Sequence, residues 1–223
     1  VADADGLLSV KLGGADTEAL NSGTIAAANA EIRANGGNVF ALAGNMDGVV
    51  KATGVSTSGG RIFLTAGNTG KVQVSGKLKS RRLAENVPVP GAKPATEGGA
   101  ITVTGGEIAI TGTLDASAEE SGVKGGEIVV FAEDTASVSG TLSARGGVGG
   151  EGGFVETSAR NTIDFAGITV DTSSEGGQTG LWLIDPVDLT VDAAAAATIS
   201  SNLASNNVSL QTTNSSASGP GNQ

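Results

Sequence analysis

One three-part phrase returns along most of the chain, and it restricts the possible folds more than any other feature of the sequence. Its clearest copy runs from Gly125 to Arg145 as GGEIVVFAEDTASVSGTLSAR. A Gly-Gly pair opens the phrase, an alternating apolar run and a short apolar patch follow, and Gly140-Thr-Leu142 closes it. Alternation with a period of two is typical of strands. The phrase therefore predicts three short strands per repeat.

The copies align residue by residue after the Gly-Gly pairs at 36, 59, 98, 125 and 152. The second residue past each pair is β-branched, the fourth is mostly apolar, and the sixth is small, which marks a corner. In chain order the three sets are Val39, Ile62, Ile101, Ile128 and Val155; Ala41, Leu64, Val103, Val130 and Thr157; and Ala43, Ala66, Gly105, Ala132 and Ala159. We predict that Ile62, Ile101, Ile128 and Val155 stack in one buried column, and that Leu64, Val103 and Val130 stack in the next.

Each copy ends on a glycine that is followed by an apolar residue and then by small polar residues. These closing elements are Gly23-Thr-Ile25, Gly54-Val55, Gly76-Lys-Leu78, Gly112-Thr-Leu114, Gly140-Thr-Leu142 and Gly167-Ile168. Repeats of about 20–30 residues, each with several short strands bounded by Gly, Asn and Ser, are what a parallel β-solenoid requires. The sequence therefore predicts an all-β parallel β-helix over residues 1–192, with about three short strands per coil.

Two other classes of chain compete with this prediction. The 36 glycines and 3% aromatic residues would suit a disordered chain, but here the apolar residues recur at regular intervals instead of being spread diffusely. A helical repeat conflicts with the period-2 runs and with their frequent glycines. The net charge of −10 argues against nucleic acid as a partner. No apolar run approaches the roughly 18 residues that a membrane-spanning helix needs.

The regular pattern breaks at residues 81–97, where the spacing between Gly-Gly pairs rises to 39 residues. Three prolines in this segment cannot donate ladder hydrogen bonds, so we expect a protruding loop that the fold does not require. A basic cluster introduces the loop: Lys77, Lys79, Arg81 and Arg82. Such charges are most often a solvated edge beside a loop, and the functional alternative is a docking patch for an acidic glycan or another surface.

The end of the chain changes character. Leu181 to Val191 carries the only tryptophan, Trp182, and predicts the last regular strand region. Asp192 and the alanines after it predict a short helix over 193–203, with Asp192 as its N-cap. Ala196, Ile199 and Leu203 are predicted to pack against the preceding coil, where Trp182 directs its indole N–H to a carbonyl or water. A terminal strand completes the unit 193–213, and residues 214–223 read as a flexible linker.

No motif in the sequence predicts catalysis or a cofactor. Gly147, Gly149 and Gly152 match G-x-G-x-x-G formally, but the strand-turn-helix context of a nucleotide site is missing, so a turn between coils is the better interpretation. The carboxylate pairs Glu119-Glu120, Glu133-Asp134 and Asp185/Asp188 fall in predicted turns or at strand ends. The chain has no His and no Cys, which excludes nucleophilic triads. We therefore expect no enzymatic activity, no cofactor and no metal site.

Several phrases together resemble a known family. The Gly-Gly coils, Gly152-Gly-Phe-Val-Glu-Thr-Ser158, Leu181-Trp-Leu-Ile-Asp-Pro-Val-Asp-Leu-Thr190 and the alanine-rich stretch after it are similar to filamentous-haemagglutinin-like exoproteins of two-partner secretion systems. The similarity covers about residues 20–213, and Trp-Leu-Ile-Asp-Pro is its most specific part. The N-terminal secretion domain of that family, with its Asn-Pro-Asn motifs, does not occur in this sequence.

The resemblance implies a segment of a large bacterial protein that passes through a dedicated outer-membrane β-barrel transporter. It implies a right-handed β-helix that is secreted to, or held at, the bacterial cell surface and acts in adhesion, aggregation or biofilm formation. Host or matrix glycans or proteins would be its partners. The alternative is a β-helix that binds or cleaves polysaccharide through the face beside the 81–97 loop, because parallel β-helices include such enzymes.

Overall fold

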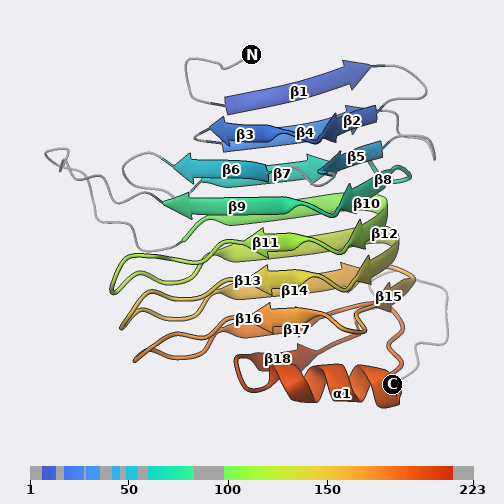
Figure 1. Ribbon diagram of the computed structural model, residues 1–223. Helices are drawn as coiled ribbons and strands as arrows, with labels where there is room; N and C mark the ends of the chain where they lie inside the picture. The colour runs from blue at the N-terminus through green and yellow to red at the C-terminus, as the bar shows by residue number, and fades with distance from the viewer. Residues whose placement is uncertain are drawn as a thin grey trace, which may run out of the picture.

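A computed structural model describes the chain over residues 7–13, 18–27, 29–35, 42–45, 49–54, 60–82 and 98–212. Over these ranges the chain winds into a stack of coils in which the strands pair in parallel (Figure 1). A complete coil has three faces, which we name rear, side and front after their positions in Figure 1. The predicted parallel β-solenoid is therefore confirmed.

Each face is a ladder of strands from successive coils. The rear face contains β1 (Leu7–Gly13), β4 (Asn29–Asn35), β7 (Arg61–Thr65), the first half of β10 (Ala100–Ile110), the first half of β12 (Glu127–Val138), β14 (Phe154–Ala159), β17 (Leu181–Ile184) and β18 (Asn207–Leu210). The side face contains β2 (Glu18–Asn21), β5 (Leu42–Asn45), β8 (Lys71–Val74), the second halves of β10 and β12, and β15 (Thr162–Asp164). The front face contains β3 (Thr24–Ala27), β6 (Val49–Gly54), β9 (Lys77–Arg82), β11 (Thr113–Asp115), β13 (Thr141–Ser143) and β16 (Thr169–Asp171).

The winding is right-handed. In Figure 1 the coils descend from the N-terminus, the front strands β9 and β11 run towards the left, and the rear halves of β10 and β12 run towards the right. This is the sense that parallel crossover connections favour. Two of the coils carry the chain from the rear face to the side face without ending the strand, and in β10 a register shift between Gly105 and Glu107 makes that corner.

The coils repeat at a fixed distance in sequence over the second half of the chain. Ala100, Glu127, Phe154 and Leu181 hold one register position on the rear face, 27 residues apart. Residue i of one coil therefore lies about 4.8 Å from residue i+27 of the next. An apolar residue repeated at this spacing becomes a continuous column inside the stack.

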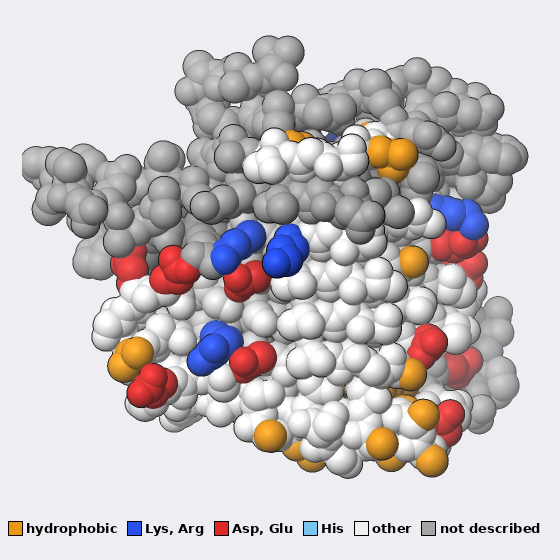
Figure 2. Space-filling view, in the orientation of Figure 1, with side chains coloured by type: hydrophobic (Ala, Val, Ile, Leu, Met, Phe, Trp, Pro, Cys, Tyr) orange, Lys and Arg blue, Asp and Glu red, His pale blue; other side chains and the backbone are white. Residues whose placement is uncertain are grey.

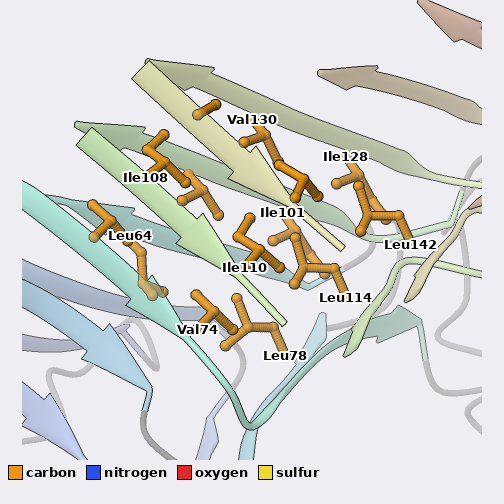
Figure 3. Packing of buried hydrophobic residues seen from close by; sticks show 14 of the residues in the cluster. Leu64, Val74, Leu78, Ile101, Ile108, Ile110, Leu114, Ile128, Val130 and Leu142 are labelled. Atoms are coloured by element: carbon orange, nitrogen blue, oxygen red, sulfur yellow. The ribbon is translucent and has the colours of Figure 1, made fainter. Parts of the chain in front are cut away.

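The inward side chains of the rear face form the two predicted columns (Figure 3). Ile62, Ile101, Ile128 and Val155 pair in register in one column, and Leu64, Val103 and Val130 pair in the next. All seven side chains are at most 1% exposed. Burial of each side chain contributes roughly 1.5–3 kcal/mol. The outward side chains are mostly small or polar, so the surface in Figure 2 carries few large hydrophobic side chains.

The sequence alignment is wrong for the earliest copy. The Gly-Gly pair at 36 was expected to precede a rear strand, yet Ile62 pairs with Ala30 of β4, upstream of that pair. Ala43, expected at the rear corner, pairs with Val72 on the side face. Val39 lies outside the described residues. The β4 coil is longer than those after it, because Asn29 and Arg61 share one register position 32 residues apart, and this irregular length moved the alignment.

Two of the predicted closing elements are also misplaced. On the front face, Val50 and Val170 hold the column positions that were predicted for Val55 and Ile168. Gly167 has a φ of 79° and belongs to the turn before β16, so the strand begins after the Gly-Ile dipeptide. In a glycine-rich chain such dipeptides recur too often to fix the register.

The recurring Gly-Gly pairs place backbone against backbone at the corner between the front and rear faces. A side chain at Gly126 would collide with the carbonyl of Gly99, and one at Gly153 would collide with the carbonyl of Gly126. Those carbonyls accept the next coil's ladder bonds, since Glu127 N donates to Gly99 O at 3.0 Å and Phe154 N donates to Gly126 O at 2.9 Å. The second glycine of each pair is therefore needed for close approach.

Trp182 continues the first buried column, below Val155. Its side chain is 0% exposed, and its ring meets the Phe165 ring edge-on with 5.9 Å between centroids. The indole N–H donates to the hydroxyl of Thr157 at 3.0 Å, where a carbonyl or water was predicted. Thr157 occupies a position that is Leu64, Val103 or Val130 in other coils, and the buried indole donor explains this polar exception.

The 81–97 loop begins later than predicted. Arg81 and Arg82 form the last two residues of β9 and pair in register with β6. Residues 83–97 lie outside the described ranges. The strands on either side of this segment pair as ordinary neighbours, because β10 pairs with β7 over Ala100–Thr104 and β11 pairs with β9. That this segment protrudes and is dispensable stays a prediction.

A helix takes the place of a front strand at the C-terminal end, as predicted. α1 (Ala193–Asn202) begins at Asp192, whose carboxylate accepts a hydrogen bond from Ala195 N at 2.8 Å. The predicted packing face is partly wrong. Ile199 packs against the core, but Ala196 is exposed and Leu203 is 55% exposed. The chain then adds β18 parallel to β17 on the rear face, so Leu181–Ile184 is not the last strand.

Two buried asparagines at the end of α1 complete the edge of the front sheet. Asn202 accepts from Val170 N at 2.6 Å and donates to Ile168 O at 3.0 Å. Asn206 accepts from Thr172 N at 2.9 Å and donates to Val170 O at 2.7 Å. Each side-chain amide thus supplies one acceptor and one donor, as the next strand's backbone would. This need for polar partners explains why Asn202 packs inward and the apolar Leu203 does not.

The register of the columns can be tested with one charge. Ile128→Asp should lower the free energy of unfolding by more than about 4 kcal/mol, because it replaces a buried aliphatic side chain with an unpaired carboxylate. Val129→Asp, one residue later on the outward side of β12, is the matched control and should cost far less. Urea denaturation measures both. Equal losses for the two variants would mean that the register is wrong.

The edge seal predicts a second effect. Asn206→Ala leaves Thr172 N–H and Val170 C=O without their side-chain partner, and each orphaned group costs about 1–3 kcal/mol. The variant should therefore lose roughly 2–4 kcal/mol of unfolding free energy. Ser200→Ala, on the exposed side of α1, should change it by less than about 0.5 kcal/mol. A fully stable Asn206→Ala protein would show that the amide does not support the β16 edge.

Candidate functional site

The predicted basic cluster lies on β9 at the front face. Lys77 and Lys79 point outward, while Leu78 and Ser80 between and beside them are 0% exposed. Arg81 and Arg82 continue the same strand, and only their backbone is described. The alternation of a strand thus brings the two lysines together on the front surface, two residues apart. A docking role for the cluster stays a prediction.

Lys79 belongs to a column of alternating charge. Its ammonium lies 3.6 Å from the Asp115 carboxylate in the next coil. Further down the face, Arg145 lies 3.4 Å from the Asp171 carboxylate. Figure 2 shows positive and negative side chains next to each other on this face, not a continuous basic patch. The arrangement is an ion ladder along the solenoid axis, and its partners are about one strand spacing apart.

A groove of about 420 Å³ lies beside this ladder, where the front strands meet the turns that lead back to the rear face. Arg145 lies at its centre, with Asp115 and Glu119 from the coil above and Glu175 from the coil below. Gly146 and Gly147 also line the groove, and their lack of side chains leaves the space open. Apart from Val148 and Ala118, the lining is polar or glycine.

The turns beside the groove form a ladder of their own. Gly122, Gly149 and Gly176 lie 27 residues apart and have φ values of 76°, 75° and 75°. Gly122 N donates to Val148 O at 2.8 Å, and Gly149 N donates to Glu175 O at 2.7 Å. The glycine-rich segment 146–153 therefore forms a turn between coils, in agreement with the sequence interpretation. The 27-residue recurrence of single glycines was the signal that could have predicted this stacked turn.

A second depression, of about 370 Å³, lies on the side face. Its outward positions are mainly small polar residues, among them Thr135, Ser137 and Thr162. Lys71 and Glu107 form an ion pair of 2.6 Å across two neighbouring strands at its border. Shallow outward hollows of this kind follow from short side chains at repeated positions.

The carboxylate pairs singled out in the sequence are separate from one another. Glu133 forms an ion pair with Arg160, and Asp134 accepts from the Asn161 amide at 2.7 Å. Glu119 lies at the front groove. In the ranges that the structure describes, no three Asp or Glu side chains are placed to hold a metal ion. Within the same ranges, no helix is long and apolar enough to cross a membrane.

Comparison of the chain with protein-family models, with curated proteins and with solved structures found no match.

The ion ladder makes a testable prediction. Lys79→Gln should lower the unfolding free energy by less than about 1 kcal/mol, because both partners of the Lys79–Asp115 pair are partly exposed. The loss should shrink as salt is added, since the ions screen such pairs. Urea titrations at low and high salt measure the effect, with Lys77→Gln as the neighbouring control. A salt-independent loss of several kcal/mol would contradict the view of the ladder as a surface feature.

Proposed function

We propose that this chain is a non-catalytic stem and adhesive segment of a secreted bacterial surface exoprotein, acting in adhesion, aggregation or biofilm formation. The observation that carries the proposal is the unbroken stack of the rear face. Strands from β1 to β18 pair in a single parallel order, and the apolar residues from Ile62 to Trp182 form one column inside it. Such a stack is a stiff rod that presents repeated outward surfaces.

The dimensions of the rod suit a spacer. The eight rear strands span about 34 Å at roughly 4.8 Å per strand spacing. Its stability rests on ladders and aliphatic columns and not on disulfides, since the chain has no cysteine. A solenoid that gains one coil at a time can fold progressively as it emerges from a narrow channel, because each new coil packs on the last. This is compatible with passage through an outer-membrane β-barrel transporter, the partner that the family resemblance implies.

The adhesive surface in this proposal is the front face. Lys77 and Lys79 lie beside the point where the 83–97 segment leaves β9, and outward-facing charge favours rapid encounter with charged surfaces. Host or matrix glycans and proteins are the proposed partners, and the bacterial cell surface is the proposed location. No catalytic or cofactor-binding residue belongs to the proposal.

A second candidate function is polysaccharide binding or cleavage in the front groove. The observation that favours it is the position of Arg145 among Asp115, Glu119 and Glu175 in a groove of about 420 Å³. Carboxylates and a guanidinium can together bind several sugar hydroxyls. Cleavage would also need two carboxyl groups placed on either side of a glycosidic bond.

One set of measurements separates the two candidates. Beads coated with the chain should adhere to surfaces that carry matrix glycans or proteins, and Lys77→Gln with Lys79→Gln should weaken that adherence. Lys71→Gln, on the side face, is the matched control and should adhere normally. A reducing-sugar assay over a panel of polysaccharides should detect no turnover.

The contrary outcomes are equally specific. Release of reducing ends from any polysaccharide would overturn the non-catalytic proposal. Glycan capture that is lost in Arg145→Gln but kept in the double lysine variant would move the binding function to the groove. Adherence that no front-face variant changes would remove this face from the account.

A further inference from the structure

The C-terminal end of the stack carries an apolar surface without charge. Val191, Leu203 and Leu210 are 46%, 55% and 44% exposed, and they are three of the six large apolar side chains that stand out on the described surface. No residue between 193 and 212 is charged. Figure 2 shows hydrophobic side chains gathered along the lower edge of the molecule. Charged residues are depleted in the same way at the centres of protein interfaces.

The two sheets end differently at this surface. The front sheet is sealed, because Asn202 and Asn206 occupy the ladder groups of β16. The rear sheet ends on β18, which pairs only with β17 in the described part of the chain. Asn207 N donates to Gly180 O at 3.0 Å and Gln211 N donates to Ile184 O at 2.9 Å. In a parallel strand alternate residues bond to opposite neighbours, so the N–H and C=O groups of Val208 and Leu210 face away from β17.

The end surface is level, and this makes it suitable for stacking. An α-helix is about 10 Å across, close to two strand spacings of roughly 4.8 Å. α1 lies under β16 in the front, and two further strands, β17 and β18, lie beyond β14 in the rear. Figure 1 shows β18 and α1 at the same level at the bottom of the stack. The edge of β18 is therefore not recessed behind the helix.

The strand at the opposite end has the pattern that β18 would accept. Val208 and Leu210 hold the register positions below Trp182 and Ile184. At the N-terminal end, Leu8 and Val10 of β1 hold the register positions of the same two columns, through Ala30 and Ile32. The sequences agree in phase, as Val-Ser-Leu in β18 and Leu-Ser-Val in β1.

Charge does not oppose this pairing. β1 contains a single charged residue, Lys11, and β3 contains none. Lys11 would lie beside the uncharged Gln211 if β1 followed β18 in parallel register. β3 would approach α1 on the front side, where Ala196 and Leu203 are exposed. Both columns would then continue from one molecule into the next without a buried charge.

We propose that the C-terminal end of one chain binds the N-terminal coil of a second copy, with β18 of the first pairing in parallel with β1 of the second. The contact joins two different surfaces, so it is heterologous and does not close on itself. Copies therefore add head to tail and lengthen the rod. This inference does not depend on the adhesive function proposed above.

The test uses the 223-residue chain and two variants that each block one end. Leu210→Lys places a charge at the β18 edge, and Leu8→Lys places one in β1. In sedimentation velocity the unaltered chain should show a sedimentation coefficient that rises with concentration, beyond that of a dimer. Each variant alone should be monomeric, with an association constant reduced at least about tenfold. An equimolar mixture of the two should form a dimer and nothing larger, because one free end of each kind remains.

Two further variants serve as controls. Val148→Lys, at an equally exposed apolar residue on the lateral turn, should associate like the unaltered chain. Leu210→Pro removes an outward N–H of β18 without adding charge, and it should block association as Leu210→Lys does. Circular dichroism checks that every variant keeps its fold.

Three results would overturn the proposal. The unaltered chain may not remain monomeric at all concentrations if the contact is real, so a constant monomer contradicts it. A dimer formed by Leu8→Lys alone would show that β18 pairs with another β18, not with β1. Association that Leu210→Pro and Leu210→Lys leave unchanged would place the contact elsewhere.

Discussion

The parallel ladder between successive coils is the constraint on which the rest of this structure depends. A coil of this length cannot bury its apolar residues alone, so Ile128 is buried only because Ile101 and Val155 lie in register above and below it. The same register brings Gly126 against Gly99 at the corner, where no side chain fits. It also places Lys79 against Asp115 on the surface. Core, corners and ion ladder are thus three results of one 27-residue repeat.

The central columns could be predicted from the sequence because their signal is redundant. A Gly-Gly pair, a β-branched residue two positions later and a small residue at the corner all recur together around Ile101 and Ile128. The prediction failed where the signal was a single short match. Gly54-Val55 and Gly167-Ile168 resemble the closing phrase, yet Val50 and Val170 hold the column positions. The ladder register decides between such matches, and it is a property of two coils, not of one.

The C-terminal end shows a different limit of sequence reasoning. Apolar periodicity predicted that Leu203 packs inward, but the edge of β16 needs hydrogen-bond partners more than it needs another apolar contact. Asn202 therefore faces the sheet and Leu203 faces outward. Trp182 likewise chose a buried hydroxyl, that of Thr157. At the candidate site, the sequence located Lys77 and Lys79, but a groove formed by three coils can be recognised only once the coils are stacked.

Methyl-selective NMR tests the register of the stack most directly. Cross-peaks between the methyl groups of Ile101 and Ile128, and between those of Ile128 and Val155, should be strong because each pair is one strand spacing apart. Ile101 and Val155 should show no direct cross-peak, since two spacings separate them by about 9.6 Å. Strong cross-peaks from Ile128 to the Thr102 methyl, in place of those to Ile101, would reveal a one-residue slip. That slip would turn every predicted column to the opposite face and contradict the account.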